Sequence, residues 1–525
     1  MQKFKTYNYE ADGCCLKTFG VLLEADAPEE AIRRYLTGET VFWNNWRGSF
    51  FGLLIDTING ITLLFNDHIG SKMVFYTQSA EGLVWDTNLF DLAQTIGANA
   101  DNENYLWQML IYGYSPVGET VFKAIHRLQA GEYVCAKKGK VEKHIYHRFD
   151  NTPNSLSIEE NIERIDTAFR HAIERVILKN EEYEYTHFIP LSAGLDSRMV
   201  NCVAHEIAKT PIHTITYSQS NYFDETTPKE LSAYWNYINH FTPLDSGECL
   251  LLLDEASRMT SGLVQYSGAA ETLYGLPEIA KQQAGIFLTG MAGDIIVGTA
   301  YTRHKSNQTY HIGDGALLPI MHLETLRRAL PSDFEQLYSN REIFYLYVRA
   351  FNCANLGSPL IHQQFGESYS PFCDVDVLKA AYAAPLEQRW NHRLYDQWIL
   401  TKYPDIAKWK HNGVYTIGHR PYMVSISNHM LPLQDLPKRA AEYILKRLHV
   451  LSKPKETIGH SMNPEDDWFM QNETLRTWAE KYIQTNLELL NNYPEVQQIA
   501  QQLSKGNANE RMQVMSLLAC LRQAR

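Results

Sequence analysis

The sequence has few cysteines, and they form no recognisable metal-binding or disulfide pattern. Eight cysteines are spread over 525 residues without the paired spacing of zinc ligands, at positions 14, 15, 135, 202, 249, 353, 373 and 520. In a chain this long, scattered cysteines are typical of reduced and mostly buried thiols. We therefore expect a cytoplasmic protein.

Long apolar runs and basic clusters are also missing. No apolar run approaches the ~20 residues that a membrane helix needs, and Met1–Lys5 is not followed by the apolar core of a signal peptide. Against 60 Asp and Glu residues stand 48 Lys and Arg, which leaves a net charge of −12. These features predict neither a membrane nor a nucleic acid as a partner.

The first part of the chain is rich in predicted strands. A length of 525 residues exceeds one hydrophobic core, so we expect two domains or three. Within residues 1–150, the apolar runs Ser49–Asp56 and Ile61–Asp67 flank Asn59-Gly60, a pair typical of hairpin turns. This pattern predicts an antiparallel first domain. The polar residues 147–156 are typical of a linker.

The second domain, residues 151–525, is expected to begin with a helix. Ser155 or Ser157 can cap it, and Ile162, Ile165 and Phe169 begin an apolar stripe at helix spacing. Strands then alternate with helices, with His213–Tyr217 and Gly285–Thr289 as two of the strands. A short helix is expected near Glu230–Tyr237. This alternation predicts a parallel α/β sheet.

The stretch from Phe188 to Arg198 combines a strand, a small-residue turn and a helix. Phe188–Leu191 has the length of a buried parallel strand, and helix periodicity begins after Asp196. The turn therefore brings N–H groups to a helix N-terminus, where the dipole favours an anion such as phosphate. The spacing of the common phosphate loop is missing. The turn resembles instead the Ser-Gly-Gly-x-Asp-Ser loop of ATP pyrophosphatases, with Ala193 replacing the first Gly. Taken alone, an ordinary strand-to-helix turn is an equal alternative.

A second small-residue turn, at the end of the strand Gly285–Thr289, also carries an aspartate, Asp294. Ligands bind at the carboxyl ends of parallel strands, so Asp196 and Asp294 are expected to share one site. Carboxylates repel a triphosphate unless Mg²⁺ stands between them. We therefore predict ATP and Mg²⁺ as ligands, with both aspartates as metal-binding and catalytic residues. The other predicted ATP contacts are Leu191 and Tyr217 near adenine, Ser192, Gly194 and Ser197 near phosphate, and Thr289 and Gly290 near the ribose or α-phosphate.

In order and approximate spacing, these motifs resemble the synthetase domain of the asparagine synthetase family. The segments that carry the resemblance include 191–197, 214–217, 288–294, 370–374 and 393–406. The resemblance implies an ATP pyrophosphatase domain, similar to adenine nucleotide alpha hydrolases, with helical additions. It also implies amide formation: a carboxylate attacks the α-phosphate of ATP, pyrophosphate leaves, and ammonia or an amine captures the acyl-adenylate. Residues 433–525 are typical of amphipathic helices and carry no motif.

Parts of the first domain resemble the glutamine amidotransferase domain of the same family. The segments are 48–51, 66–72, 112–114 and 128–131, and they imply an α+β domain with Ntn-hydrolase-like antiparallel sheets. Such a glutaminase needs a cysteine whose own α-amino group is free. Here Gln2 follows Met1, Asn66 replaces the family's Arg, and Cys14 or Cys15 would serve only after a propeptide is removed. We expect a domain that keeps the fold without glutaminase activity, as a platform or as a gate to the substrate cleft.

Two positions depart from the family pattern. Met291 stands where the family has a Glu credited with proton handling, and Ile295 replaces the Glu after the metal-binding Asp. Glu271 or Tyr274 are candidate substitute bases, although a surface role for Glu271 is the simpler hypothesis. The catalytic lysine is assigned to Lys410. A strict register would place Asn412 there, and Arg420 is a further alternative; the transition state needs a cation.

The sequence thus predicts an Mg·ATP-dependent, AMP-forming ligase that joins a small-molecule carboxylate, aspartate or another acid, to ammonia or an amine. One alternative is a tailoring or ring-closing amide synthetase of the β-lactam synthetase or lasso-peptide cyclase type. Another is a nucleotide-binding scaffold that has lost catalysis. The identity of both substrates and the oligomeric state, a homodimer included, stay open.

Overall fold

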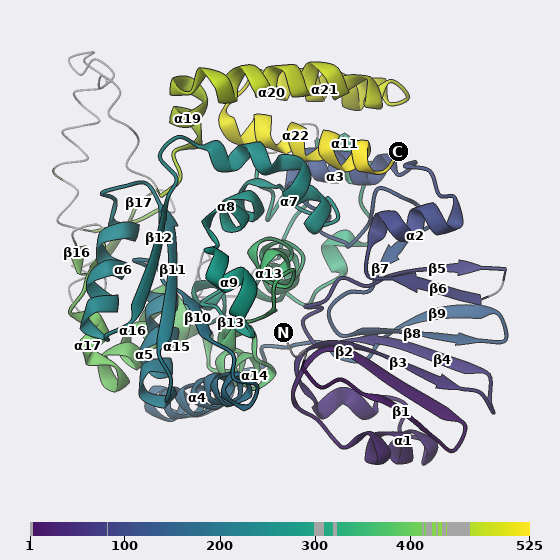
Figure 1. Ribbon diagram of the computed structural model, residues 1–525, viewed down its shortest axis with the longest axis horizontal. Coiled ribbons are helices and arrows are strands. Elements are labelled where there is room, and N and C mark those ends of the chain that lie inside the picture. Colours follow the sequence, from purple (N-terminus) through teal and green to yellow (C-terminus); the bar gives the residue numbers. More distant parts are fainter. Residues whose placement is uncertain are drawn as a thin grey trace.

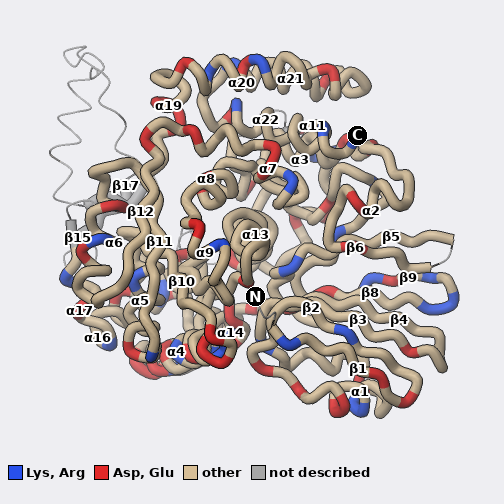
Figure 2. Tube along the Cα trace, viewed as in Figure 1, with Lys and Arg blue, Asp and Glu red and all other residues tan. Residues whose placement is uncertain are grey.

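The computed structural model describes residues 4–80, 82–298, 309–318, 323–411, 414–415, 423–426, 429–432, 437 and 462–525. Three groups of elements are visible in Figure 1: antiparallel strands on the right, a parallel sheet on the left, and a layer of helices from the end of the chain across the top. Lys and Arg are interspersed with Asp and Glu along the trace (Figure 2). Within the described part of the chain, every helix is too short or too polar to cross a membrane.

The first part of the chain forms two antiparallel sheets, as predicted. The larger has the strand order β1-β2-β3-β4-β8-β9 and the smaller β6-β5-β7. The predicted hairpin joins β3 to β4, with Asp56 opposite Ile61. The elements are β1 (Asn8–Ala11), β2 (Cys14–Glu24), α1 (Pro28–Leu36), η1 (Phe42–Asn45), β3 (Arg47–Asp56), β4 (Ile61–Asn66), β5 (Phe75–Ser79), β6 (Gly82–Asp86), α2 (Leu89–Ile96), α3 (Glu103–Tyr112), β7 (His126–Arg127), β8 (Glu132–Lys137) and β9 (Lys140–Ile145).

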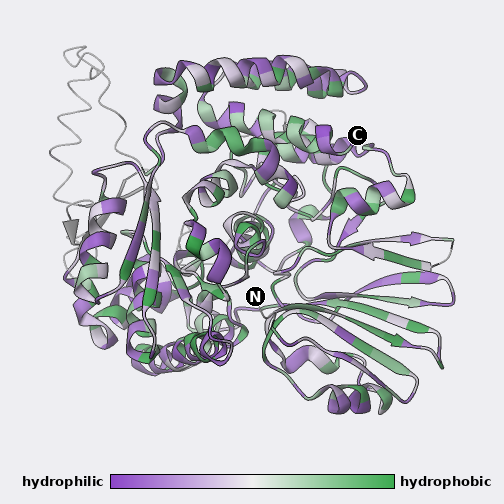
Figure 3. Ribbon diagram, in the orientation of Figure 1, coloured by the Kyte–Doolittle hydropathy of each residue, from purple (hydrophilic) through white to green (hydrophobic). Residues whose placement is uncertain are grey.

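Apolar side chains cover both faces of the larger sheet. On one face Trp43 stacks on Phe65, with ring centroids 4.0 Å apart, in a cluster that also contains Leu16 and Phe50. The hydrophobic colouring of these strands is visible in Figure 3. A second cluster, with Leu53, Leu64 and Val134, covers the other face, so the central strands β3 and β4 are mostly buried, whereas the edge strands β1 and β9 are more exposed.

A long helix, α4 (Ile158–Glu182), follows the irregular residues 146–157. The prediction of its cap at Ser157 is confirmed: the Ser157 hydroxyl accepts from the Glu160 N–H, and the Glu160 side chain accepts from the Ser157 N–H. The predicted stripe that includes Ile162, Ile165 and Phe169 is buried. The helix packs against α14 (Val375–Ala383) and α5 (Leu195–Ile207) beside the parallel sheet.

The second part of the chain forms the predicted parallel sheet. Strands β10 (His187–Pro190), β11 (Ile212–Ser218) and β12 (Ile238–Pro243) pair in parallel, and so do β13 (Ile286–Leu288) and β14 (Glu367–Tyr369). A parallel bridge between Thr186 and Ala284 joins the two groups at β10 and β13. The helix expected near 230–237 begins earlier, as α6 (Phe223–Tyr234), with Asp224 and Glu225 in its first turn, where the dipole favours acids.

Further helices surround this sheet. Those used below are α7 (Leu253–Met259), α8 (Ser267–Gly275), α10 (Gly293–Ile296), α13 (Ser358–His362) and α16 (Arg393–Lys402). The remaining helices of three residues or more before the terminal layer are η2 (Glu248–Leu252), α9 (Glu278–Gln283), α11 (Leu323–Arg328), η3 (Phe334–Gln336), α12 (Arg341–Tyr345), η4 (Leu346–Phe351), η5 (Ala354–Leu356), η6 (Pro371–Cys373), α15 (Leu386–Arg389), η7 (Trp390–His392) and α17 (Pro404–Ala407). Short strands are β15 (Lys410–His411), β16 (Val414–Tyr415), β17 (Met423–Ile426) and β18 (His429–Pro432).

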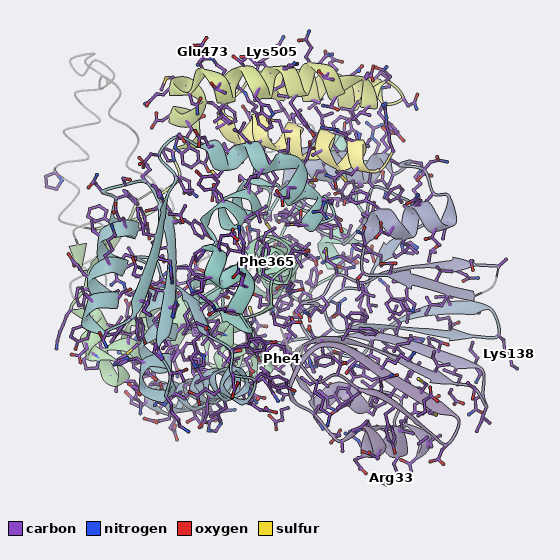
Figure 4. The ribbon with its side chains drawn as sticks, viewed as in Figure 1. Phe4, Arg33, Lys138, Phe365, Glu473 and Lys505 are labelled. Atoms are coloured by element: carbon purple, nitrogen blue, oxygen red, sulfur yellow. The ribbon has the colours of Figure 1, made fainter. Side chains whose placement is uncertain are left out.

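The end of the chain is helical, as expected, and its last helix is deeply buried. The layer contains α19 (Glu465–Gln471), α20 (Glu473–Asn486), η9 (Leu487–Leu490), α21 (Pro494–Leu503) and α22 (Ala508–Gln523). Figure 4 shows Glu473 and Lys505 on its outer side. Helix α22 packs against α3 and α7, and the side chain of Gln513 donates to the Leu110 carbonyl (2.9 Å). One hydrophobic cluster therefore includes residues from the start, the middle and the end of the chain.

Candidate active site

A cavity of about 820 Å³ opens at the carboxyl ends of the parallel strands. This volume lies near the upper end of the roughly 300–1,000 Å³ of small-molecule sites. Every predicted nucleotide or metal contact within the described residues lines it: Leu191, Ser192, Gly194, Asp196, Ser197, Tyr217, Thr289, Gly290 and Asp294. The structure therefore brings together residues that lie about 100 positions apart in the sequence.

The loop between β10 and α5 is held by its own hydrogen bonds. The Ser192 N–H donates to the Ser197 Oγ (3.0 Å), and the Gly194 N–H donates to the Ser192 Oγ (3.1 Å). The Ala193 N–H donates to Asp224 (2.7 Å). Ala193 is fully buried and does not line the cavity, so the methyl group that replaces a glycine there leaves the cavity unobstructed.

The two predicted metal-binding aspartates are close neighbours. The backbone N–H of Asp294 donates to the Asp196 Oδ2 (2.9 Å), and the Tyr395 hydroxyl donates to the Asp196 Oδ1 (2.7 Å). Burial, and next the negative charge of Asp294, raises the pKa of Asp196. Burial also raises the pKa of Asp294. A cation between the carboxylates would reverse this trend, so the donor set fits a divalent ion such as Mg²⁺.

Glycines permit this approach of the two turns. A Cβ at Gly293 would lie 2.6 Å from the carboxyl carbon of Asp196, and one at Gly290 would lie 2.6 Å from the Ser197 backbone nitrogen. Both distances are shorter than a carbon contact allows. Within the described residues, no group of three or more His, Cys, Asp or Glu side chains could hold a metal on its own. Mg²⁺ usually takes one or two carboxylates and completes its shell with phosphate oxygens and water, so two aspartates suffice.

The sequence interpretation missed several residues that hold the site. The guanidinium of Arg198 donates to the Ala193 carbonyl and to the Trp409 carbonyl (2.9 Å), and Tyr395 and Asp224 bond as described above. The resemblance included the segment that contains Tyr395, but only the fold places its hydroxyl beside Asp196. Arg198 carried no signal, because an Arg in the first turn of a helix usually faces solvent.

The predicted catalytic lysine begins a short strand next to this loop. Lys410 belongs to β15, one residue after the Trp409 carbonyl that Arg198 binds. Its side chain is not among the described atoms, and the alternatives Asn412 and Arg420 lie outside the described residues. The assignment of Lys410 therefore stays a prediction.

The candidates for a substitute base do not line the cavity. Glu271 is only 5% exposed, so the expectation of a surface glutamate is wrong. It accepts from the Asn463 amide (2.6 Å), and burial followed by the charge of Glu465 raises its pKa. Tyr274 is 37% exposed. Met291 lines the cavity, and its carbonyl accepts from the Ser370 hydroxyl (2.8 Å).

The cysteines considered for a glutaminase lie inside a paired strand. Cys14 and Cys15 begin β2, opposite β1 on one side and β3 on the other, and Cys14 is 2% exposed. Cleavage before either residue would cut the chain at the hairpin that joins β1 to β2. At the other end of this domain, Lys72 forms an ion pair with Glu367 of the parallel-sheet region.

Comparison with known families matches both halves. Residues 169–343 match the family model described as asparagine synthase, and residues 6–147 match the glutamine amidotransferase domain. No curated protein matches the chain.

Two solved structures are similar over part of the chain. One is titled the structure of the allosteric regulatory enzyme of purine biosynthesis (10% identity, TM-score 0.18, 41% of this chain and 48% of that one). The other is glutamine phosphoribosylpyrophosphate amidotransferase from B. subtilis with ADP and GMP (9%, 0.19, 41% and 49%). The chain spans about half the length of each.

Proposed function

This chain belongs to an asparagine synthetase-like family, and on that premise we propose that it is an ATP-dependent, AMP-forming carbon–nitrogen ligase. An oxygen of a substrate carboxylate attacks the α-phosphorus of ATP, the bond to the β-phosphate oxygen breaks, and pyrophosphate leaves. The nitrogen of ammonia or an amine then attacks the acyl carbon, and AMP leaves. The observation that supports this most is the meeting of Asp196 and Asp294 at one cavity, beside small-residue turns.

In the first step, the predicted metal-binding, phosphate-binding and lysine residues would each stabilise charge. Bound Mg²⁺ would neutralise the charge that builds on pyrophosphate. Asp196 and Asp294 would hold the ion, with Tyr395 orienting Asp196. The hydroxyls of Ser192 and Ser197, which bond to each other (3.0 Å), would turn toward phosphate. Lys410 would supply a cation next to the α-phosphate.

The acceptor is the less defined half of the reaction. Met291 cannot accept a proton, so the cavity differs from that of a family member with Glu at this position. This favours, as second candidate, a tailoring or ring-closing amide synthetase in which another group deprotonates the amine. Free ammonia acting on aspartate remains the first case to test.

We further propose that the first domain has lost glutamine hydrolysis and works in the cytoplasm as part of the ligase. The nucleophile of such a glutaminase must carry a free α-amino group, whereas Cys14 and Cys15 lie within a strand that is paired on both sides. All eight cysteines are free thiols, which suits a reducing compartment.

Pyrophosphate release tests these proposals directly. Purified protein with Mg·ATP and ammonium is expected to release pyrophosphate in the presence of at least one acid from a panel. Complete lack of release with every acid would favour the scaffold alternative. Glutamine should not replace ammonium; equal turnover with glutamine would refute the loss of glutaminase activity.

A further inference from the structure

The cavity has a wall that the nucleotide contacts do not use. We call it the α13 wall, after the helix at its centre. Its members come from four separate segments, and they are Val264, Leu317, Cys353, Ala354, Pro359 and His362. The central part of the molecule that contains α13, with Phe365 just after it, is visible in Figure 4.

The α13 wall lies beside the turn where adenylation is proposed. The ring of His362 stacks on Phe287 of β13, with centroids 4.4 Å apart and planes 15° from parallel. Phe287 lies in β13 two residues before Thr289, which follows the end of that strand, so the stacked rings are close along the chain to the proposed reaction turn. Pro359 also shares a small void with Thr289 and Met291. The predicted adenine contacts, in contrast, are Leu191, just after β10, and Tyr217 on β11.

The α13 wall carries no charge, and its side chains are apolar except for His362, whose buried Nδ1 has no hydrogen-bond partner among the described residues. Within the described lining of the cavity there is no Lys or Arg. His362 is 4% exposed, and burial lowers its pKa to about 3, so its ring is neutral at physiological pH. The guanidinium of Arg349 donates to the Gly315 carbonyl (3.3 Å) and to the Cys353 Sγ (3.7 Å). These bonds hold its charge behind the wall.

Polar neighbours of the wall are bonded to each other. The Gln265 amide donates to the Asn509 Oδ1 (2.6 Å), and the Thr272 hydroxyl donates to the Ser358 hydroxyl (2.7 Å). A zwitterionic amino acid would leave an ammonium and a carboxylate without counter-charges there, which is costly. An apolar group would instead gain by leaving water.

On the basis of the proposed function, we infer that the α13 wall holds the body of the carboxylic acid, and that this acid has an aliphatic or aromatic body in place of the charged groups of aspartate. The carboxylate would then point toward Thr289 and Gly290, and the apolar body toward Pro359, Ala354 and Leu317.

The test compares hexanoate, phenylacetate and aspartate by two measurements on the full-length protein. Pyrophosphate release with Mg·ATP and ammonium gives kcat/KM for each acid, and calorimetric titration without ATP gives binding. We expect kcat/KM at least tenfold higher for hexanoate or phenylacetate than for aspartate, and measurable binding of the better apolar acid alone.

A variant places a cation in the wall. Ala354→Arg should lower the hexanoate-to-aspartate ratio of kcat/KM at least tenfold. Ala136→Arg, on β8 of the antiparallel sheet, adds the same charge far from the cavity and should leave the ratio unchanged. Thermal melting of both variants shows whether they are folded, and if Ala354→Arg does not fold, Ala354→Phe tests the same wall by obstructing phenylacetate more than acetate.

The outcomes separate the inference from the function on which it rests. Aspartate as the best acid would overturn the inference while the ligase function stands. A third outcome is that hexanoate binds, that Ala354→Arg weakens this binding, and that no acid supports pyrophosphate release. This outcome would reject the ligase function and support the apolar acid site. If apolar acids neither bind nor support turnover, the inference is overturned. This holds even if adenine is what occupies the wall.

Discussion

Aspartates follow buried strands in both halves of the molecule, yet they have different surroundings. Asp67, just after β4, is 2% exposed, and its carboxylate accepts from the N–H groups of Phe50, Ile69 and Ser71 (3.0–3.1 Å). Asp294, after β13, faces a cavity and another carboxylate. The first carboxylate is enclosed by hydrogen bonds of the fold, whereas the second lies at the cavity, where we propose that it binds a metal. Position after a strand therefore does not identify a functional aspartate; its partners do.

The two regions also differ in the volume of the cavities that they contain. Where the antiparallel half meets the parallel sheet, Gly48, Ser49 and Ser71 line a void of about 10 Å³, hardly enough for one water molecule. The parallel half encloses about 820 Å³. Phe4, which Figure 4 places near the junction, packs its ring 5.1 Å from those of Tyr183 and Tyr185. The junction is thus closely packed, and the proposed chemistry is expected in the parallel half.

The largest effect is expected at the aspartate pair. Asp196→Asn or Asp294→Asn should lower pyrophosphate release roughly 1000-fold or more, because each removes a charge needed to hold the metal on the leaving group. Thermal stability should stay equal or rise, because the two carboxylates repel each other in the free protein. Release that persists in both variants would show that the pair is not the metal site.

At Asp67 we expect the opposite result. Asp67→Ala leaves three buried N–H donors without an acceptor, which should lower the free energy of unfolding by about 4 kcal/mol. Activity per folded molecule should be retained. Urea unfolding, with pyrophosphate release measured in parallel, checks both statements, and a stable but inactive variant would contradict the comparison.

The ion pair between the halves should have a somewhat smaller effect. The Lys72 and Glu367 side chains are 10% and 15% exposed, so Lys72→Met leaves a nearly buried carboxylate unpaired and should cost about 3 kcal/mol. The double variant with Glu367→Gln should recover part of this loss. If urea unfolding shows no recovery of the free energy of unfolding in the double variant, the Lys72–Glu367 pair does not stabilise the contact between the halves.

The smallest effects are expected from alanine substitutions at two glycines, one in each half of the molecule. Gly293→Ala should lower activity about tenfold, because its Cβ would displace the Asp196 carboxyl group. Gly60→Ala, in the hairpin at φ +62° with open space around it, should cost about 1 kcal/mol of stability without loss of activity. Equal activities of the two variants in the pyrophosphate assay would mean that the close approach at Gly293 is not needed.

Local patterns explain why much of the fold could be predicted. The strand, turn and helix around Asp196 follow from periodicity and small residues over about a dozen positions, and the cap at Ser157 from a single Ser–Glu pair. The proximity of Asp196 and Asp294 was also predictable, because parallel strands end at one edge of a sheet.

Other parts of the site had no local signal. Tyr395 reaches Asp196 across 199 positions, and Arg198 reaches Trp409 across 211. Glu271 differs from these two, because it is the only charged residue between Arg258 and Glu278, and this apolar context favoured the burial that the surface hypothesis overlooked. Such contacts depend on how helices pack, and one sequence does not contain that information in readable form.

The sequence alone determined the two kinds of sheet, the family resemblance and the residues of the nucleotide turns, because these depend on short-range periodicity and on motifs. Only the tertiary structure decided that α22 joins the core of the first domain, that the Tyr395 hydroxyl bonds to Asp196, and that an uncharged wall lines the cavity that contains the two aspartates. The reason is physical: these features arise where residues hundreds of positions apart exclude water together, and burial is a property of the assembled fold.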